Sequence, residues 1–96
     1  MADLRTRTVA LPAIVDLDVL DMVRDELIEA VEAGPVAISG GRVERVSTNA
    51  LIMLISAAET ARRNNYAFEV ADASEPMLAA IERLGLTESF AGITRG

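Results

Sequence analysis

Short apolar runs alternate with longer amphipathic segments along this chain, and the alternation limits the folds that it can adopt. Residues 8–11, 36–39 and 67–71 are apolar runs of strand length. After each run, apolar residues recur every three or four positions, as they do on one face of a helix. Strands that alternate with helices need crossover connections and favour a largely parallel sheet. We therefore predict an α/β sandwich.

The ends of the predicted helices carry recognisable signals. Asp16 or Asp18 can cap the first helix, and Gly34-Pro35 follows its last apolar residue. Ser74 is suited to cap the third helix, because its hydroxyl precedes an apolar segment. Gly85 fits the left-handed position after that helix, where a Schellman turn closes. These signals predict where the first and third helices begin and end.

The strand pattern predicts how the sheet is arranged. Pro12 interrupts the first run, so we expect a hairpin-like entry or an edge strand there, with Ile14-Val15 as a second extended piece. Residues 36–39 lie between turn residues and are expected to form a central strand that is buried on both faces. Residues 87–90 are expected to form a last helical turn, and Ile93 a short edge strand.

Aliphatic residues supply nearly all the apolar side chains, since only 3% of the chain is aromatic. We expect an aliphatic core built around Phe68 and Phe90. Met22, Met53 and Met77 fall on the apolar faces of the predicted helices, where methionine usually fills the core.

Length and charge restrict the classes of protein that fit. A chain of 96 residues suits one domain, which we place at 8–93, with flexible ends at 1–7 and 94–96. Its net charge of −6 opposes nucleic-acid binding. No apolar run approaches the roughly 20 residues that cross a bilayer, and the first residues lack the apolar core of a signal peptide. We therefore expect a cytoplasmic protein without membrane insertion.

Histidine and cysteine are both absent, which removes the usual nucleophiles, general bases and zinc ligands. We expect no enzymatic activity, no cofactor and no metal. The acidic cluster from Asp16 to Asp25 lacks the glycine and glutamate of a calcium loop, so capping and a solvated face explain it better. Gly40-Gly41 is not followed by Lys-Ser/Thr, so we interpret it as a tight turn rather than a phosphate loop.

Two adjacent hydroxyl side chains, Ser47 and Thr48, lie between a predicted strand region and the apolar run 50–55. A hydroxyl at such a junction can cap a helix, accept a phosphate, or do both. The residues alone favour capping and leave open which hydroxyl does it. Arg42 and Arg45 lie a few residues upstream, where solvated surface charge is the favoured role and pairing with a phosphate is the alternative.

The strand 36–39, the hydroxyl-bearing segment 47–51 and a third helix that closes on Leu84-Gly85-Leu86 together resemble the STAS domain. This is the fold of bacterial anti-sigma-factor antagonists. The resemblance covers 8–93 and implies a STAS-like α/β sandwich, a small, mostly parallel or mixed sheet with helices packed on it. Family members commonly read Asp-Ser/Thr-x-Gly-Leu, which aligns here with Ser47, Thr48, Asn49, Ala50 and Leu51. Ser47 thus replaces the aspartate, and Ala50 replaces the glycine.

The resemblance implies a non-enzymatic regulatory protein with Thr48, or alternatively Ser47, as phosphoacceptor. The implied partner is an anti-sigma factor of the serine-kinase type, bound through Ser47, Thr48, Asn49 and Arg45, with a phosphatase reversing the modification. The alternative is a STAS subunit of a larger assembly, such as a lipid-transport ABC system or a chemotaxis-associated signalling module. A third hypothesis, by analogy of fold, is a small ligand or nucleotide in the groove beside the motif.

Overall fold

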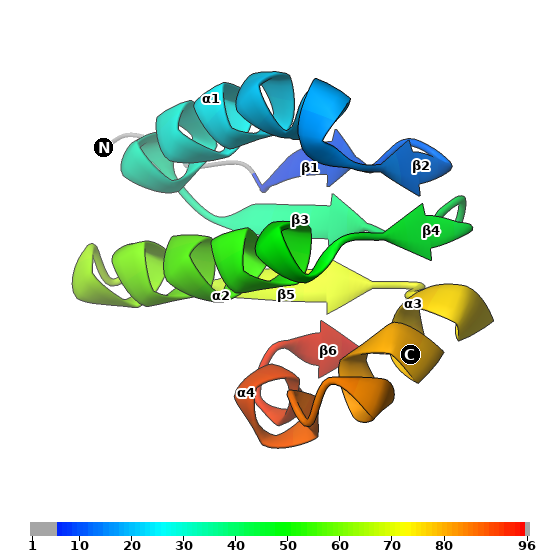
Figure 1. Cartoon of the computed structure of the whole chain (residues 1–96). Coiled ribbons are helices and arrows are strands. Elements are labelled where there is room, and N and C mark those ends of the chain that lie inside the picture. Colours follow the sequence, from blue (N-terminus) through cyan, green and yellow to red (C-terminus); the bar gives the residue numbers. More distant parts are fainter. Residues whose placement is uncertain (1–5, 96) are drawn as a thin grey trace.

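The computed structural model describes residues 6–95 as a sheet with helices packed on it (Figure 1). The strands are β1 (Arg7–Ala10), β2 (Ile14–Val15), β3 (Val36–Ser39), β4 (Arg45–Val46), β5 (Phe68–Ala71) and β6 (Thr94–Arg95). The helices are α1 (Leu17–Ala33), α2 (Thr48–Arg63), α3 (Glu75–Arg83) and α4 (Thr87–Ala91). The main sheet has the order β1-β3-β5-β6, while β2 and β4 form a separate ribbon. All strand pairs within residues 6–95 are parallel, which confirms the predicted α/β fold.

The first strand lies at an edge of the main sheet, as expected, where it pairs with β3. The hairpin-like entry is wrong, because β2 turns away from β1 and pairs with β4 instead. The last strand was expected at Ile93 but begins one residue later, at Thr94. The Ile93 carbonyl still accepts a hydrogen bond from the Val70 amide of β5 (2.6 Å). The ends that we expected to be flexible are 1–7 and 94–96, and of these residues Arg7 and Thr94–Arg95 belong to strands. Residues 1–5 and 96 lie outside the described part of the chain.

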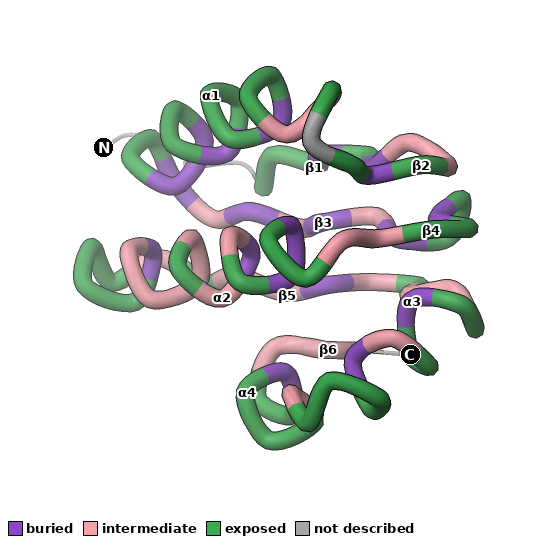
Figure 2. The backbone as a smooth tube through the Cα atoms, viewed as in Figure 1, coloured by how far each residue is buried: buried purple, intermediate pink, exposed green. Residues whose placement is uncertain are grey.

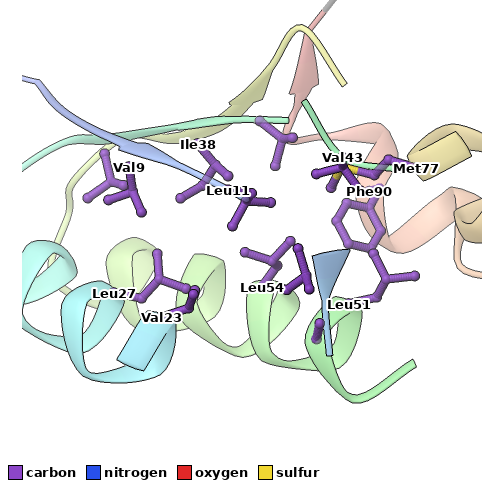
Figure 3. Packing of buried hydrophobic residues seen from close by; sticks show 14 of the residues in the cluster. Val9, Leu11, Val23, Leu27, Ile38, Val43, Leu51, Leu54, Met77 and Phe90 are labelled. Atoms are coloured by element: carbon purple, nitrogen blue, oxygen red, sulfur yellow. The ribbon is translucent and has the colours of Figure 1, made fainter. Parts of the chain in front are cut away.

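One face of the main sheet forms the core with α1 and α2 (Figure 3). The strand register sets Val9, Ile38 and Val70 side by side, and all three side chains are buried. Leu27 of α1 and Leu54 of α2 pack against this face, and both are buried as well. Alternate residues of a strand point to opposite faces, so this apolar set belongs to one face only. The two helices and the three strands thus share a single apolar layer.

The strand β3 is central, but the prediction that both of its faces are buried is wrong. Val36 and Ile38 are buried, whereas Ala37 and Ser39 are only half-buried (Figure 2). The reason is that α1 and α2 lie on the same side of the sheet and leave the second face less covered. Small side chains on that second face therefore complete the strand without a full helix layer over them.

The aromatic and methionine predictions are correct in part. Phe90 is buried in the core, but Phe68 is only half-buried. Met77 is fully buried, whereas Met22 is 67% exposed, so its assignment to the core is wrong. The buried stripe of α1 passes through the next residue, Val23, and successive helical residues point about 100° apart. Met22 therefore faces solvent.

The helix ends follow the predicted signals closely. The Asp18 amide donates to Asp16 Oδ1 (3.1 Å), which makes Asp16 the N-cap of α1. Ser74 Oγ accepts from the Met77 amide and caps α3. Gly85 has φ +71, and the Leu86 amide donates to the Ile81 carbonyl (2.9 Å), as in a Schellman turn. None of the helices between residues 6 and 95 is long and apolar enough to cross a membrane.

Candidate functional site

The hydroxyl pair lies where the β2–β4 ribbon ends and α2 begins. The ribbon aligns Val46 with Val15, and the Ser47 amide then donates to the Val15 carbonyl (3.0 Å). Ser47 Oγ accepts from the Ala50 amide (3.1 Å), so Ser47 is the N-cap of α2. Thr48 is the first residue of the helix, and its side chain is exposed. The two hydroxyls therefore have different environments: one is engaged in the cap, and the other faces solvent.

The structure separates the other predicted partner-binding residues into two groups. Arg45 and Ser47 line a hollow between the β2–β4 ribbon and α3, with a volume of 450 Å³. Asn49 does not line this hollow but contributes to a groove between α1 and α2. Thr48 is exposed and lines neither of them. A partner that contacts all four predicted residues must therefore cover the start of α2 from both sides.

The hollow also contains a residue that the sequence analysis missed. Arg83, in the last turn of α3, lines it opposite Arg45, while Asp16 and Glu44 contribute carboxylates. A basic residue near a helix C-terminus is common because it complements the helix dipole, so nothing in the local sequence marks Arg83 as part of a site. Arg42, which the sequence analysis offered as a possible phosphate partner, is exposed and does not line this hollow.

The start of α2 differs in charge from the starts of α1 and α3. The first turn of α1 contains Asp18 beside the Asp16 cap, and the first turn of α3 contains Glu75. The first turn of α2, which the structure describes in full, contains no acidic residue. Because the amino end of a helix carries about half a positive charge, an anion is favoured there. The neutral Ser47 cap leaves this charge uncompensated within the helix.

The glycine pair after β3 makes a turn, as predicted. The Val43 amide donates to the Gly40 carbonyl (3.2 Å), and the turn brings Gly40 against α3. A Cβ at Gly40 would lie 2.8 Å from Met77 Sδ and 3.3 Å from Ala73 Cα. Close packing against Met77 and the Ala73 backbone therefore disfavours a larger residue here. Within residues 6–95, no cluster of three or more His, Cys, Asp or Glu residues could hold a metal ion.

The far end of α2 contains a pair of charged residues whose interaction changes a pKa. The Arg62 guanidinium donates a hydrogen bond to Glu59 Oε1, and this bond together with the positive charge holds the pKa of Glu59 below its usual value. The pair is exposed and lies about three turns from Thr48. It belongs to the surface of the helix rather than to the site.

The parallel sheet, the helix layer on one face and the hydroxyl-bearing start of α2 define a layered α/β domain. A family model described as "Mlab, STAS domain" matches residues 2–94, which is essentially the whole chain. The chain therefore belongs to the STAS domain family. STAS domains are generally non-enzymatic regulatory or interaction domains, and they mediate contacts between proteins.

A solved structure has the same fold. It is the crystal structure of a sulfate transporter family protein from Wolinella succinogenes, which superposes with a TM-score of 0.68 at 13% sequence identity. The match covers 93% of this chain and 75% of that chain. At this low identity the likeness establishes the fold alone. A comparison with curated proteins finds no match.

Proposed function

We propose that this STAS domain is a non-enzymatic interaction module whose binding to a partner protein is switched by phosphorylation of Thr48. The observation that carries the proposal is the division of roles between the two hydroxyls. Ser47 holds the helix cap, while Thr48 is exposed at the first helical position. A kinase can therefore reach the Thr48 hydroxyl without breaking the cap. Ser47, which is half-buried and hydrogen-bonded, is the less accessible acceptor.

The start of α2 is suited to hold a phosphate once it is attached. A phosphothreonine adds roughly −1.5 to −2 charges, and the exposed amides and dipole of a helix N-terminus favour an anion. No carboxylate in the first turn of α2 opposes the added charge. The domain can therefore accept the group without unfolding, while the surface presented to a partner changes from neutral to strongly negative.

The proposed partner is an anti-sigma factor of the serine-kinase type, with a phosphatase that restores the free hydroxyl. Binding would involve Thr48 together with Ser47, Asn49 and Arg45, which lie on the two sides of the helix start. Because such a kinase uses ATP, the proposal also assigns the protein to the cytoplasm. In this proposal the partner binds the unmodified surface and is repelled when Thr48 carries the phosphate.

A second candidate function is favoured by the comparisons. The matching family model is described as "Mlab, STAS domain", and the solved relative is a sulfate transporter family protein. Both descriptions favour a constitutive subunit of a transport assembly, such as a lipid-transport ABC system, over a chemotaxis-associated module. In that case the same surface around Thr48 would bind the transporter permanently, and its hydroxyl would serve as a contact.

The two functions are distinguished by adding a charge at Thr48. Thr48→Glu should lose the partner that the wild-type domain captures from its native cells, whereas Thr48→Ala should keep it. Thr87→Glu is the matched control, because Thr87 is also an exposed first residue of a helix. Mass spectrometry of the native protein should find phosphate on Thr48. A transporter ATPase captured without any phosphate on Thr48 would support the second candidate instead.

A further inference from the structure

An apolar groove of 410 Å³ lies between α1 and α2, separate from the hollow beside Arg45. Leu27 and Val31 of α1 and Met53 of α2 are among the side chains that line it. Its apolar lining continues to the surface at Ile28 and Ile52, which are 49% and 46% exposed. The two side chains come from different helices and border the same groove, and an exposed apolar surface that is contiguous in this way can mark a binding site.

The length of the groove suits a short helix. On α2 it extends from Asn49 to Thr60, which at 1.5 Å per residue is about 16 Å, or three helical turns. The helices α1 and α2 pack side by side above the sheet, so their outer surfaces form the two walls (Figure 1). Recognition of an amphipathic helix by such a groove uses apolar anchors spaced three or four residues apart. Ile28 and Ile52 are placed to contact anchors of this kind.

The helix α1, which forms one wall of the groove, is strongly acidic, while the charged side chains of α1 that line the groove itself are Arg24 and Glu32. Five exposed carboxylates recur along α1 at intervals of three or four residues, and they are Asp18, Asp21, Asp25, Glu29 and Glu32. Like charges at this spacing repel one another and raise the free energy of the folded chain.

Few positive charges offset this repulsion. Within residues 6–95, Arg24 is the one basic residue of α1 and lies at the groove, and Arg7 forms an ion pair with Glu29 (3.9 Å). The acidic stripe, meaning these five carboxylates, would therefore be stabilised by a cationic partner.

We propose that this groove binds an amphipathic helix of a partner protein, with apolar residues against Ile28 and Ile52 and basic residues along the acidic stripe. Charge complementarity selects this occupant. A second copy stacked on the groove would bring acidic side chains of α1 close to those of its partner, and an anionic membrane surface would repel the stripe. The inference goes beyond the proposed function, because the groove shares Asn49 with the proposed surface around Thr48 but does not include Thr48 and needs no phosphate.

The test uses a synthetic helix of roughly four turns as the probe, with leucines on one face and lysines beside them. A scrambled peptide of the same composition and a peptide with glutamate in place of lysine are the controls. Fluorescence anisotropy should show binding of the lysine peptide alone. Ile28→Asp and Ile52→Asp should each weaken it by about tenfold, as expected for a central anchor. Asp25→Lys should weaken binding and reduce its dependence on salt.

Matched controls come from α3, on another part of the surface. Leu78 is 43% exposed and Glu82 is exposed, so Leu78→Asp and Glu82→Lys make the same chemical changes outside the groove. Neither should alter the affinity, and circular dichroism should show that all variants are folded. Equal losses for Ile28→Asp and Leu78→Asp would overturn the proposal, as would equal binding of the scrambled peptide.

Two further results would assign the groove to another occupant and overturn the proposal. The first is a concentration-dependent dimer in sedimentation that Ile52→Asp abolishes. The second is co-sedimentation with phosphatidylglycerol vesicles that the same substitution abolishes. Amide chemical shifts of the isotopically labelled protein should instead change along α1 and α2 on addition of the lysine peptide. Changes confined to α3 and α4 would contradict the proposed location.

Discussion

Replacement of Ser47 by alanine should destabilise the protein while replacement of Thr48 should not. Ser47 Oγ accepts the Ala50 amide at 3.1 Å, and this hydrogen bond is half-buried. Loss of a serine cap costs about 1 kcal/mol of unfolding free energy. For a domain of this size, that loss lowers the melting temperature by about 4 to 8 °C. Thr48 is exposed and lies outside the cap hydrogen bond, so Thr48→Ala should change the unfolding free energy by less than about 0.5 kcal/mol.

Urea unfolding followed by circular dichroism measures both variants. Ser47→Ala should lower the midpoint by roughly 0.5 to 1 M without a change in slope, because the surface exposed on unfolding stays the same. Ser47→Asp is the matched rescue, since aspartate is an equally good cap and its charge suits a helix N-terminus. An equal loss of stability in Thr48→Ala would refute the assignment of separate roles to the two hydroxyls. A Ser47→Ala variant as stable as the wild type would refute the cap itself.

Three further outcomes are expected. Urea unfolding should show that Ser74→Ala lowers the free energy of unfolding by about 2 kcal/mol, because Ser74 Oγ both caps α3 and donates to the Val43 carbonyl. In the same assay, Gly40→Ala should lower the free energy of unfolding by about 1 to 3 kcal/mol, because the added Cβ overpacks against α3. A Cβ at Gly92 has no atom within 4 Å, so Gly92→Ala should be neutral or slightly stabilising. In a carbon-detected NMR titration, Arg62→Ala should raise the pKa of Glu59.

The sign of the Glu59 effect on stability follows from the direction of its pKa. A carboxyl group whose pKa is lower in the folded state stabilises that state above its unfolded pKa, and this contribution is lost as the pH falls through the folded pKa. The Glu59 side chain is 46% exposed and pairs with Arg62 at the surface, where solvent screens the interaction, so the contribution is small. An unchanged Glu59 titration in Arg62→Ala would show that the hydrogen bond does not persist in solution.

Local chemistry was enough to predict most of the helix ends. The caps at Asp16 and Ser74 and the turn at Gly85 depend on residues within one helical turn, so their signals survive in a single sequence. The exposure of Met22 was not predicted, because we assigned Met22 to the apolar face of the helix. The buried stripe instead passes through the next residue, Val23. A shift of one residue on a helix is enough to turn a side chain from the core to solvent.

The arrangement of the site depended on contacts between distant segments. The β2–β4 ribbon has two residues per strand, which is too short for any periodic pattern, and it pairs Val15 with Val46. Arg83 lines the same hollow as Arg45 because α3 packs on that ribbon. The position of Thr48 was predicted from the resemblance, but the choice of Ser47 as the cap required knowing where α2 begins. These features come from tertiary pairing, which no local signal in the chain encodes.

The β2–β4 ribbon has a consequence for the dynamics of the protein. Its two strands end directly at the caps of α1 and α2, so Asp16 and Ser47 follow paired residues (Figure 1). The Ser47 amide is held by the Val15 carbonyl across the ribbon. Local opening of this pair would release the starts of both helices together, as a single cooperative unit in hydrogen exchange. The exchange rate of the Ser47 amide should therefore report any chemical change at the start of either helix.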